Sequence, residues 1–303
     1  MIDDSILDKY RLAGKVCAEA GEHAKSIVKP GMLMLDLATQ TEQYIKDHGA
    51  SLSFPVNLSL DDCAAHFSPE IDDTTVVPEQ GVLKIDIGTH VDGYICDHAI
   101  SVDVGSTGGV YQRLIDSSAK ALDAAIAEMH TGVNVLTLGR VIEESITADG
   151  FLPIRNLGGH NLGQYSLHGG TFIPNIATGV PHALQAGEVF AIEPFATTGA
   201  GYVSDGPRKM IFRFNKRPRK SINIQLSSTL ETIHRQFSTL PFSPRWLLDK
   251  IPKERIMPAV SQLASRDLLQ TYPLLMEKKG ALVSQAEHTV IIFEDHAEVT
   301  SVV

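Results

Sequence analysis

Two aspartates lie inside one short apolar segment, residues 84–97, which reads KIDIGTHVDGYICD. Aspartate is disfavoured within apolar strands, because burial of a carboxylate without a partner costs several kcal/mol. Asp86 and Asp97 therefore either face water at strand ends or share a compensating positive charge. A bound metal ion is one source of that charge. These two residues alone leave both interpretations open.

Three further polar residues stand beside or within strand-like apolar segments, namely His160, Glu193 and Glu287. A single glutamate of this kind is usually exposed at an edge or paired with a cation, but five such residues in one chain favour a shared cause. The negative charges of four carboxylates would be neutralised by two divalent cations. A donor set rich in oxygen suits Mn²⁺, Fe²⁺, Co²⁺ or Zn²⁺. Two such ions can activate water and polarise a carbonyl group.

Two more imidazoles, His66 and His168, are flanked by small residues in the sequences AAH and HGG. Imidazoles relay protons near pH 7 and donate hydrogen bonds to a developing oxyanion. Taken alone, each is better explained as a hydrogen-bonded structural histidine.

The two aspartates are expected on neighbouring strands of a hairpin. Leu83, Ile85 and Ile87 alternate with smaller or polar residues, a period of two that indicates a strand. The sequence Val-Asp-Gly at 91–93 is a turn signal, and residues 94–102 read as a second strand.

Helical patterns occur twice, each time before such strands. Residues 3–28 and 108–129 carry apolar stripes at helical spacing, and each is followed by a break ending in glycine. Asp36 and Thr137 are expected to cap a second helix in each half, ending at Gly49 and Gly150. An offset of 101 positions relates six identical pairs: Gly31/Gly132, Leu35/Leu136, Leu37/Leu138, Glu42/Glu143, Ile45/Ile146 and Gly49/Gly150.

The repeat extends to the strands, because Gly81 and Gly187 each precede a hydrophobic run that ends near a carboxylate. We therefore expect an α+β fold with a pseudo-twofold repeat, in which helices flank a curved antiparallel sheet. The active groups should lie between the two halves, where clefts tend to form.

The composition of the 303 residues is that of a globular protein, with 43% hydrophobic residues. The acidic start MIDDSILDK does not resemble a signal peptide, and no apolar run approaches the length of a membrane span. Three scattered cysteines without a CxxC pair fit a reducing compartment and argue against disulfides or a thiolate zinc site. A cytoplasmic protein without membrane contact is expected.

The net charge of −10 is unevenly distributed. Residues 206–279 hold 15 lysines and arginines against five acidic residues, a local net charge of about +10. A basic segment set into an acidic body usually concerns partners rather than the fold.

Nine motifs together resemble the type II methionine aminopeptidases, most closely the short archaeal form: FPVN (54–57), AAHFSP (64–69), DDTTV (72–76), KIDIGTHVDG (84–93), GGH (158–160), LHGG (167–170), AIEPFAT (191–197), TLPFSPRWL (239–247) and AEHTV (286–290). The resemblance spans almost the whole chain. It implies a monomer with the pita-bread fold that removes the initiator methionine from nascent peptides.

By motif match, the resemblance implies a dinuclear metal centre of two ions (Co, Mn, Fe or Zn) and a role for each candidate residue. Asp97 and Glu287 bridge the ions, Asp86 completes one site, and His160 with Glu193 completes the other. His66 resembles the imidazole that contacts the scissile peptide, His168 resembles the one that steadies the substrate carbonyl, and Glu193 is the candidate for proton transfer.

The same mapping gives a methionine pocket, whose aromatic walls suit a thioether, with these residues: Phe54, Asn57, Leu167, Phe195 and, near the mouth, Tyr272. By residue type alone Phe54 and Phe195 are better explained as plain core residues, and their positions beside His66 and Glu193 are what favours the pocket. One departure is His98, which stands after the second aspartate where the family often has a small or uncharged polar residue. It either tunes the metal site or points to the opposite face.

The basic segment coincides with the family's insertion. We expect a catalytic domain of residues 1–204 and 273–303, and an inserted helical, winged-helix-like subdomain of residues 205–272. The family's insert has no established role in reading nucleic acid, so no sequence-specific nucleic-acid binding is expected. The basic surface is either a ribosome contact, through ribosomal RNA, or simply a solvated charged face.

The sequence leaves two alternative functions open. An X-Pro peptidase shares the five ligands but usually carries an extra N-terminal domain and lacks this insertion. A metal-free binding protein of the same fold, associated with the ribosome or RNA, usually has substituted ligands, whereas all five positions here hold competent side chains.

Overall fold

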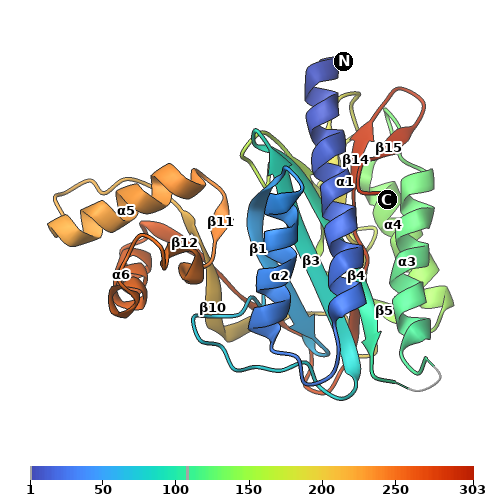
Figure 1. Cartoon of the computed structure of the whole chain (residues 1–303). Helices are drawn as coiled ribbons and strands as arrows, with labels where there is room; N and C mark the ends of the chain where they lie inside the picture. Colours follow the sequence, from blue (N-terminus) through green and yellow to red (C-terminus); the bar gives the residue numbers. More distant parts are fainter. Residues whose placement is uncertain (1, 107–108) are drawn as a thin grey trace.

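The computed structural model describes residues 2–106 and 109–303 and shows a pair of helices before the strands of each half (Figure 1). The helices of the first half are α1 (Asp4–Ile27) and α2 (Met34–Asp47), and those of the second are α3 (Gln112–Ala127) and α4 (Val135–Ala148). The predicted repeat is thereby confirmed. The predicted start of the third helix, at residue 108, lies outside the described residues.

Both predicted helix caps are wrong by three residues. Asp36 lies in the first turn of α2, which begins after an extended Leu33. Its carboxylate still interacts favourably with the helix dipole there. Thr137 lies inside α4, where Asn134 is the cap and its Oδ1 accepts a hydrogen bond from the Leu136 amide at 2.9 Å. Asparagine is the stronger N-cap, which explains the earlier start.

The first half contains the predicted hairpin. Its antiparallel sheet has the order β1 (Ser51–Leu60), β3 (Gly81–Val91) and β4 (Tyr94–Val104). Asp92 and Gly93 form the turn with φ of 51° and 85°, a left-handed pair of the type that closes tight hairpins. Small residues of α1 pack on the sheet, with Cys17 and Ala20 in one buried cluster with Ile85 and Ile87.

The second half forms a five-stranded sheet of order β15-β14-β8-β6-β7 and a three-stranded sheet of order β13-β9-β5, covered by α3 and α4. The strands are β5 (Leu152–Pro153), β6 (Gly158–Leu162), β7 (Phe172–Pro174), β8 (Val189–Ile192), β9 (Phe195–Thr197), β13 (Val283–Gln285), β14 (His288–Ile292) and β15 (Ala297–Val299). None of the described helices combines the length and apolar character that a membrane crossing requires.

One bridge joins the two halves. The Glu287 amide donates to the Ala99 carbonyl at 3.0 Å, and the Ala99 amide donates to the Glu287 carbonyl at 3.4 Å. This antiparallel bridge lies where the sheet of the first half meets that of the second. The expected curved antiparallel sheet with outer helices is therefore confirmed.

The inserted segment forms a lobe beside the body (Figure 1). Its elements are β10 (Ser204–Phe214), α5 (Ile224–Phe237), β11 (Pro241–Phe242), the 3₁₀ helix η1 (Pro244–Leu247), α6 (Lys253–Ser265) and β12 (Leu269–Met276). The lobe has its own hydrophobic cluster, which includes Phe242 and Ile256. Its sheet, of order β11-β10-β12-β2, continues into the body through β2 (Cys63–Ala65).

A buried ion pair fastens this lobe to helix α2. Arg245 of η1 donates through Nη1 to Glu42 Oε2 at 2.6 Å and through its other terminal nitrogen to Oε1, and Trp246 Nε1 donates to Oε2 at 2.8 Å. Only 7% and 4% of the two charged side chains are exposed. Every oxygen of the Glu42 carboxylate therefore has a donor from the lobe.

Replacement of Arg245 by methionine should leave the buried Glu42 charge without its cationic partner and lower the free energy of unfolding by about 3–5 kcal/mol. Arg217→Met is the matched control, because its pair with Glu231 is 66% and 59% exposed. Such exposed pairs contribute about 0–1 kcal/mol. Denaturant titration of both variants is the measurement, and equal losses would contradict a stabilising buried pair.

Candidate metal centre

The two aspartates enter the site from the hairpin. Asp86 lies in β3 and Asp97 in β4, where they pair with Ala99 and Gly88 and so stand two residues apart along the ribbon. The Asp97 backbone is fixed against the second half, because Thr289 Oγ1 accepts from its amide at 2.7 Å and donates to its carbonyl at 2.8 Å. The hairpin and the sheet junction therefore position these carboxylates together.

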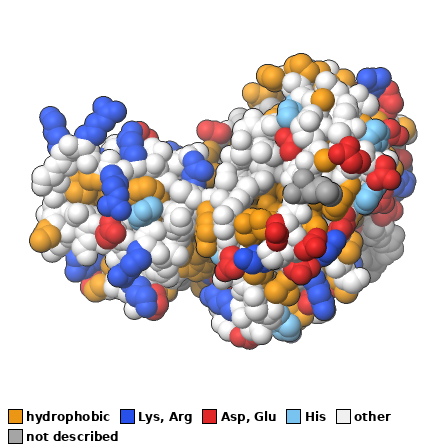
Figure 2. Space-filling view, turned by 90° about the horizontal axis from the view of Figure 1, so that it is seen from above, with side chains coloured by type: hydrophobic (Ala, Val, Ile, Leu, Met, Phe, Trp, Pro, Cys, Tyr) orange, Lys and Arg blue, Asp and Glu red, His pale blue; other side chains and the backbone are white. Residues whose placement is uncertain are grey.

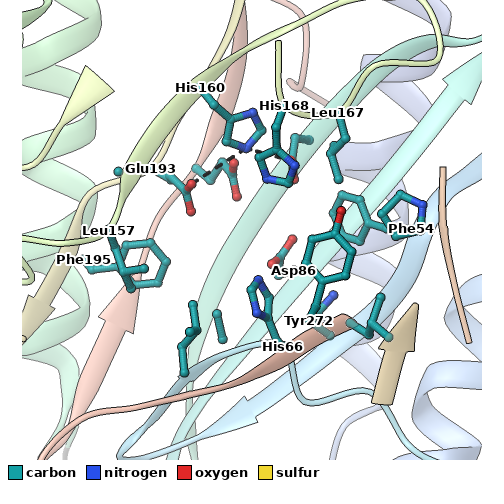
Figure 3. A pocket seen from close by; sticks show the side chains of 18 of the residues that line it. Phe54, His66, Asp86, Leu157, His160, Leu167, His168, Glu193, Phe195 and Tyr272 are labelled. Carbon is teal, nitrogen blue, oxygen red and sulfur yellow. Dashed lines mark ion pairs between the residues drawn. The ribbon is translucent and has the colours of Figure 1, made fainter. Parts of the chain in front are cut away.

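The other three candidates come from adjacent strands of the second half. His160 lies in β6 and pairs with Ala191 of β8, Glu193 directly follows β8, and Glu287 directly precedes β14. Strand β8 pairs with both β6 and β14. This strand order carries the three side chains toward the hairpin, and Figure 3 shows His160, Glu193 and Asp86 pointing into one cavity.

Donor atoms of Asp97, His160 and Glu287 lie within 4.8 Å of one another. His160 Nε2 is 3.7 Å from Asp97 Oδ2 and 3.8 Å from Glu193 Oε1. Asp86 lines the same cavity. The structure thus brings all five predicted ligands to one place, with three of them close enough to share an ion.

Gln285 is a member of this cluster that the sequence did not reveal. Its Nε2 donates to Glu193 Oε2 at 3.3 Å and to Glu287 Oε2 at 3.2 Å. An available signal was its spacing, two residues before Glu287 in an extended segment, which places both side chains on one face. The amide orients two carboxylates without adding charge.

Burial of like charges dominates the electrostatics of the cluster. Desolvation raises the pKa of Asp86 to about 7, and it raises the pKa values of Asp97, Glu193 and Glu287 well above their ordinary values, with added repulsion among the carboxylates. Desolvation and the neighbouring His168 lower the pKa of His160 to about 3. The imidazole is therefore neutral, the form that ligates metals.

The donor set fits divalent cations. Asp86 Oδ1, His160 Nδ1 and Glu287 Oε1 are buried and make no hydrogen bond within the described part of the chain. Such unsatisfied carboxylate oxygens are costly unless a proton or a cation compensates them. Hard oxygen donors with one imidazole suit Mn²⁺, Fe²⁺, Co²⁺ or Zn²⁺.

Two imidazoles and a phenol line the same cavity, with His168 beside His160 and His66 beside Tyr272 (Figure 3). His66 Nδ1 contacts the Pro273 carbonyl at 2.9 Å, and its ring meets Tyr272 edge-on at 5.6 Å. Its φ of 71° is strained for histidine, a feature that clusters at functional sites. His168 is exposed at the rim, 4.3 Å from the His160 ring, and desolvation followed by the charges of His66 and Arg213 lowers its pKa.

An apolar slot of the same cavity, which has a volume of about 230 Å³, contains all five residues predicted for the pocket: Phe54, Asn57, Leu167, Phe195 and Tyr272. Each is buried. The sequence missed several other lining residues: Ala65, Asn156, Leu157, Gly158, Phe172, Ile211, Pro241 and Leu275. Ile211 pairs with Tyr272 across β10 and β12, so strands of the inserted lobe form one wall.

His98 points away from the metal ligands. Its Nδ1 contacts the Glu287 carbonyl at 2.6 Å on the opposite face of the sheet, because neighbouring residues of a strand alternate in direction. Of the two interpretations of this residue, the opposite-face one is confirmed.

The chain matches the family model of metallopeptidase family M24 over residues 8–229. It is 42% identical to a methionine aminopeptidase of Pyrococcus horikoshii over 97% of this chain and 99% of that protein. Among solved structures, a thermophilic Arx1 has a TM-score of 0.85 at 16% identity, covering 99% of this chain and 91% of the other. A methionine aminopeptidase of Rickettsia prowazekii has a TM-score of 0.72 at 18% identity, covering 100% and 99%.

The raised pKa of Asp86 predicts how pH changes the stability of the metal-free chain. A carboxyl group whose pKa is higher in the folded state stabilises the fold below its unfolded pKa, and loses this effect as pH rises through the folded pKa. For Asp86 that window runs from 3.8 to about 7. Across this pH window the free energy of unfolding of the wild type should fall by up to about 1.4 kcal/mol per pH unit relative to that of Asp86→Asn, whose side chain stays neutral.

Denaturant titration of both proteins without metal, at several pH values, measures this difference. Addition of Mn²⁺ should restore the stability that the wild type loses at higher pH, because the cation binds the wild-type carboxylate and replaces the proton. If the difference in unfolding free energy between the two proteins stayed constant across this pH window, Asp86 would not be a buried, protonated carboxyl group.

Proposed function

Because this chain belongs to metallopeptidase family M24, we propose that it removes the initiator methionine from nascent proteins by metal-assisted hydrolysis of the first peptide bond. The observation that carries the proposal is the meeting, in one cavity, of five metal-type ligands with an apolar slot. The sequence relationship to methionine aminopeptidases over nearly the whole chain supports the substrate. We place the enzyme in the cytoplasm, where nascent chains emerge, as a monomer.

The five clustered side chains would hold two divalent ions. Asp97 and Glu287, whose donors lie close together beside His160, would be the shared ligands. Asp86 would complete one site from the hairpin, and His160 and Glu193 would complete the other from the second half. Gln285 orients Glu193 and Glu287 through its amide. When bound, the ions supply Lewis acidity toward the scissile carbonyl and lower the pKa of a water molecule.

The chain's own residues position the peptide and move the proton. Glu193, whose carboxylate borders both the ligand cluster and the open cavity, accepts a proton from the attacking water and returns it to the leaving amine. His168 faces the cavity beside His160, where its N–H would stabilise developing negative charge on the carbonyl oxygen, and His66 faces the cavity beside Tyr272. The lowered pKa of each keeps the ring neutral. His168 can therefore donate without adding a full charge. The Nδ1 of His66 donates to the Pro273 carbonyl, so its Nε2 carries the lone pair and accepts from a peptide N–H of the substrate.

The apolar slot selects the first side chain. Phe54, Phe195 and Tyr272 give it aromatic walls, which contact a thioether favourably. All three are buried and packed, so a branched or longer side chain meets a wall that cannot yield without loss of packing. Discrimination is therefore steric.

Replacement of Asp97 by asparagine should lower turnover of Met-Gly-Met-Met at least about a hundredfold, because it removes a shared carboxylate from a metal-assisted reaction. Metal-depleted protein is assayed with Co²⁺, Mn²⁺, Fe²⁺ or Zn²⁺ added back. Asp92→Asn is the matched control, since that aspartate lies in the turn of the same hairpin with its side chain 68% exposed.

Two outcomes would redirect the assignment. Faster hydrolysis of an Ala-Pro peptide than of Met-Ala-Ser would indicate an X-Pro peptidase. Absence of any metal-dependent methionine release would indicate a binding protein, although all five ligand positions hold competent side chains.

The basic lobe is a second functional feature, and we propose that it holds the enzyme near ribosomal RNA. Figure 2 shows lysine and arginine side chains gathered on this lobe. Arg219 and Lys220 are exposed in the loop before α5 and form no ion pair within the described residues, while Arg217 pairs with an exposed Glu231. Such a surface binds phosphates by releasing their counterions, without reading sequence.

Replacement of Arg217, Arg219 and Lys220 by glutamate should abolish sedimentation with ribosomes at low salt, because three attractive contacts become repulsive. Methionine release from a free peptide should persist. The matched control changes Lys15, Lys25 and Lys120 of the body to glutamate, which alters charge equally at side chains that are 66%, 54% and 63% exposed. Unchanged sedimentation of the first variant would exclude the ribosome contact through this loop.

A further inference from the structure

A second pair of ligand-type side chains lies behind the metal centre. His98 directly follows Asp97, and His288 directly follows Glu287. Since side chains alternate along extended backbone, the two carboxylates face the catalytic cavity and the two imidazoles face the other side of the sheet. There they meet, with ring centres 5.1 Å apart, across the junction between the two halves.

Both rings form their hydrogen bond through Nδ1. On His98 this bond fixes the lone pair on Nε2, and on His288 Nε2 carries the lone pair when Nδ1 donates to the serine hydroxyl. His98 Nδ1 contacts the Glu287 carbonyl at 2.6 Å, so it must carry the hydrogen and Nε2 must carry the lone pair. His288 Nδ1 contacts Ser301 Oγ at 2.8 Å. Within the described residues, neither Nε2 makes a hydrogen bond. An imidazole held through Nδ1 by a backbone carbonyl is the usual arrangement of a metal-ligating histidine.

Both rings line a groove of about 490 Å³ between α1 and α3. His98 is 6% exposed, and its Nε2 lies 3.4 Å from the position that a Cβ at Gly21 of α1 would take. The groove also contains the carboxylates of Glu22 from α1 and Asp123 from α3. Lys25 of α1 also lines the groove, with its Nζ 3.6 Å from Glu22 Oε1. The unpartnered Nε2 of a mostly buried side chain therefore faces a space in which Asp123 is the carboxylate without a cation pair within the described residues.

We propose that this groove binds one divalent transition-metal ion, such as Zn²⁺, through His98 Nε2 and His288 Nε2. Imidazole suits zinc, copper and nickel, and two imidazoles on one tetrahedral zinc, at about 2.0–2.1 Å each, have ring centres roughly 5 Å apart. Water fills the remaining positions, and Asp123 offsets part of the charge. The ion ties β4 to β14 and so braces, from behind, the two strands beside Asp97 and Glu287.

Zinc counting on the full chain tests the site. Metal-depleted protein is dialysed against buffered free Zn²⁺, and bound zinc is measured by elemental analysis. The wild type should retain one more ion per chain than His98→Gln, in which an amide can still donate to the Glu287 carbonyl. His296→Gln is the matched control, because this exposed histidine pairs with Asp295 at 2.7 Å far from the groove, and it should keep the wild-type count.

Copper distinguishes the groove from the catalytic centre. Cu²⁺ in the wild type and in His296→Gln should give an electron paramagnetic resonance component with splitting from two nitrogens, which His98→Gln should lack. Equal zinc counts in wild type and His98→Gln would overturn the proposal. The proposal would also be overturned if His98→Gln bound less zinc but kept the two-nitrogen copper signal, because the lost ion would then have come from the catalytic centre. His288→Gln provides the same test if His98→Gln does not fold.

Discussion

The rest of the structure depends on the burial of four carboxylates in one cavity. Desolvation raises the pKa of every one of them, and repulsion from neighbouring carboxylates adds to it at Asp97, Glu193 and Glu287. The metal-free site therefore carries protons that it must release when cations bind. Hydrophobic packing cannot offset the cost of burying these carboxylates, whereas positive charge at the centre of the cluster can. The scaffold must therefore be rigid enough to hold these groups together against their repulsion.

That rigidity comes from the junction of the two halves. Asp97 is fixed by two hydrogen bonds to Thr289, and the Glu287 backbone is bridged to Ala99. Each half thus supplies one of the two proposed shared ligands, and the junction sets their separation. The same junction brings His98 and His288 together on the reverse side. A single pairing of strands accounts for both arrangements.

The inserted lobe contributes to the catalytic cavity as well as to the surface. Its long strands β10 and β12 supply Ile211 and Tyr272 to the cavity wall, and β12 pairs with β2, the strand that directly precedes His66. The buried pair of Glu42 and Arg245 holds the lobe against α2. A displacement of the lobe would therefore change the wall of this cavity.

The sequence by itself determined the two similar halves, the hairpin and the five ligand-type residues, because strand alternation, helical spacing and glycine breaks are local properties. Only the tertiary structure decided which atoms meet. Gln285 bonds to Glu193, 92 positions away, and His98 reaches the Glu287 carbonyl, 189 positions away. It also showed that the inserted strands wall the cavity and that Asn134, rather than Thr137, caps α4. Such contacts depend on how separate strands pair and curve in space, which no local pattern encodes.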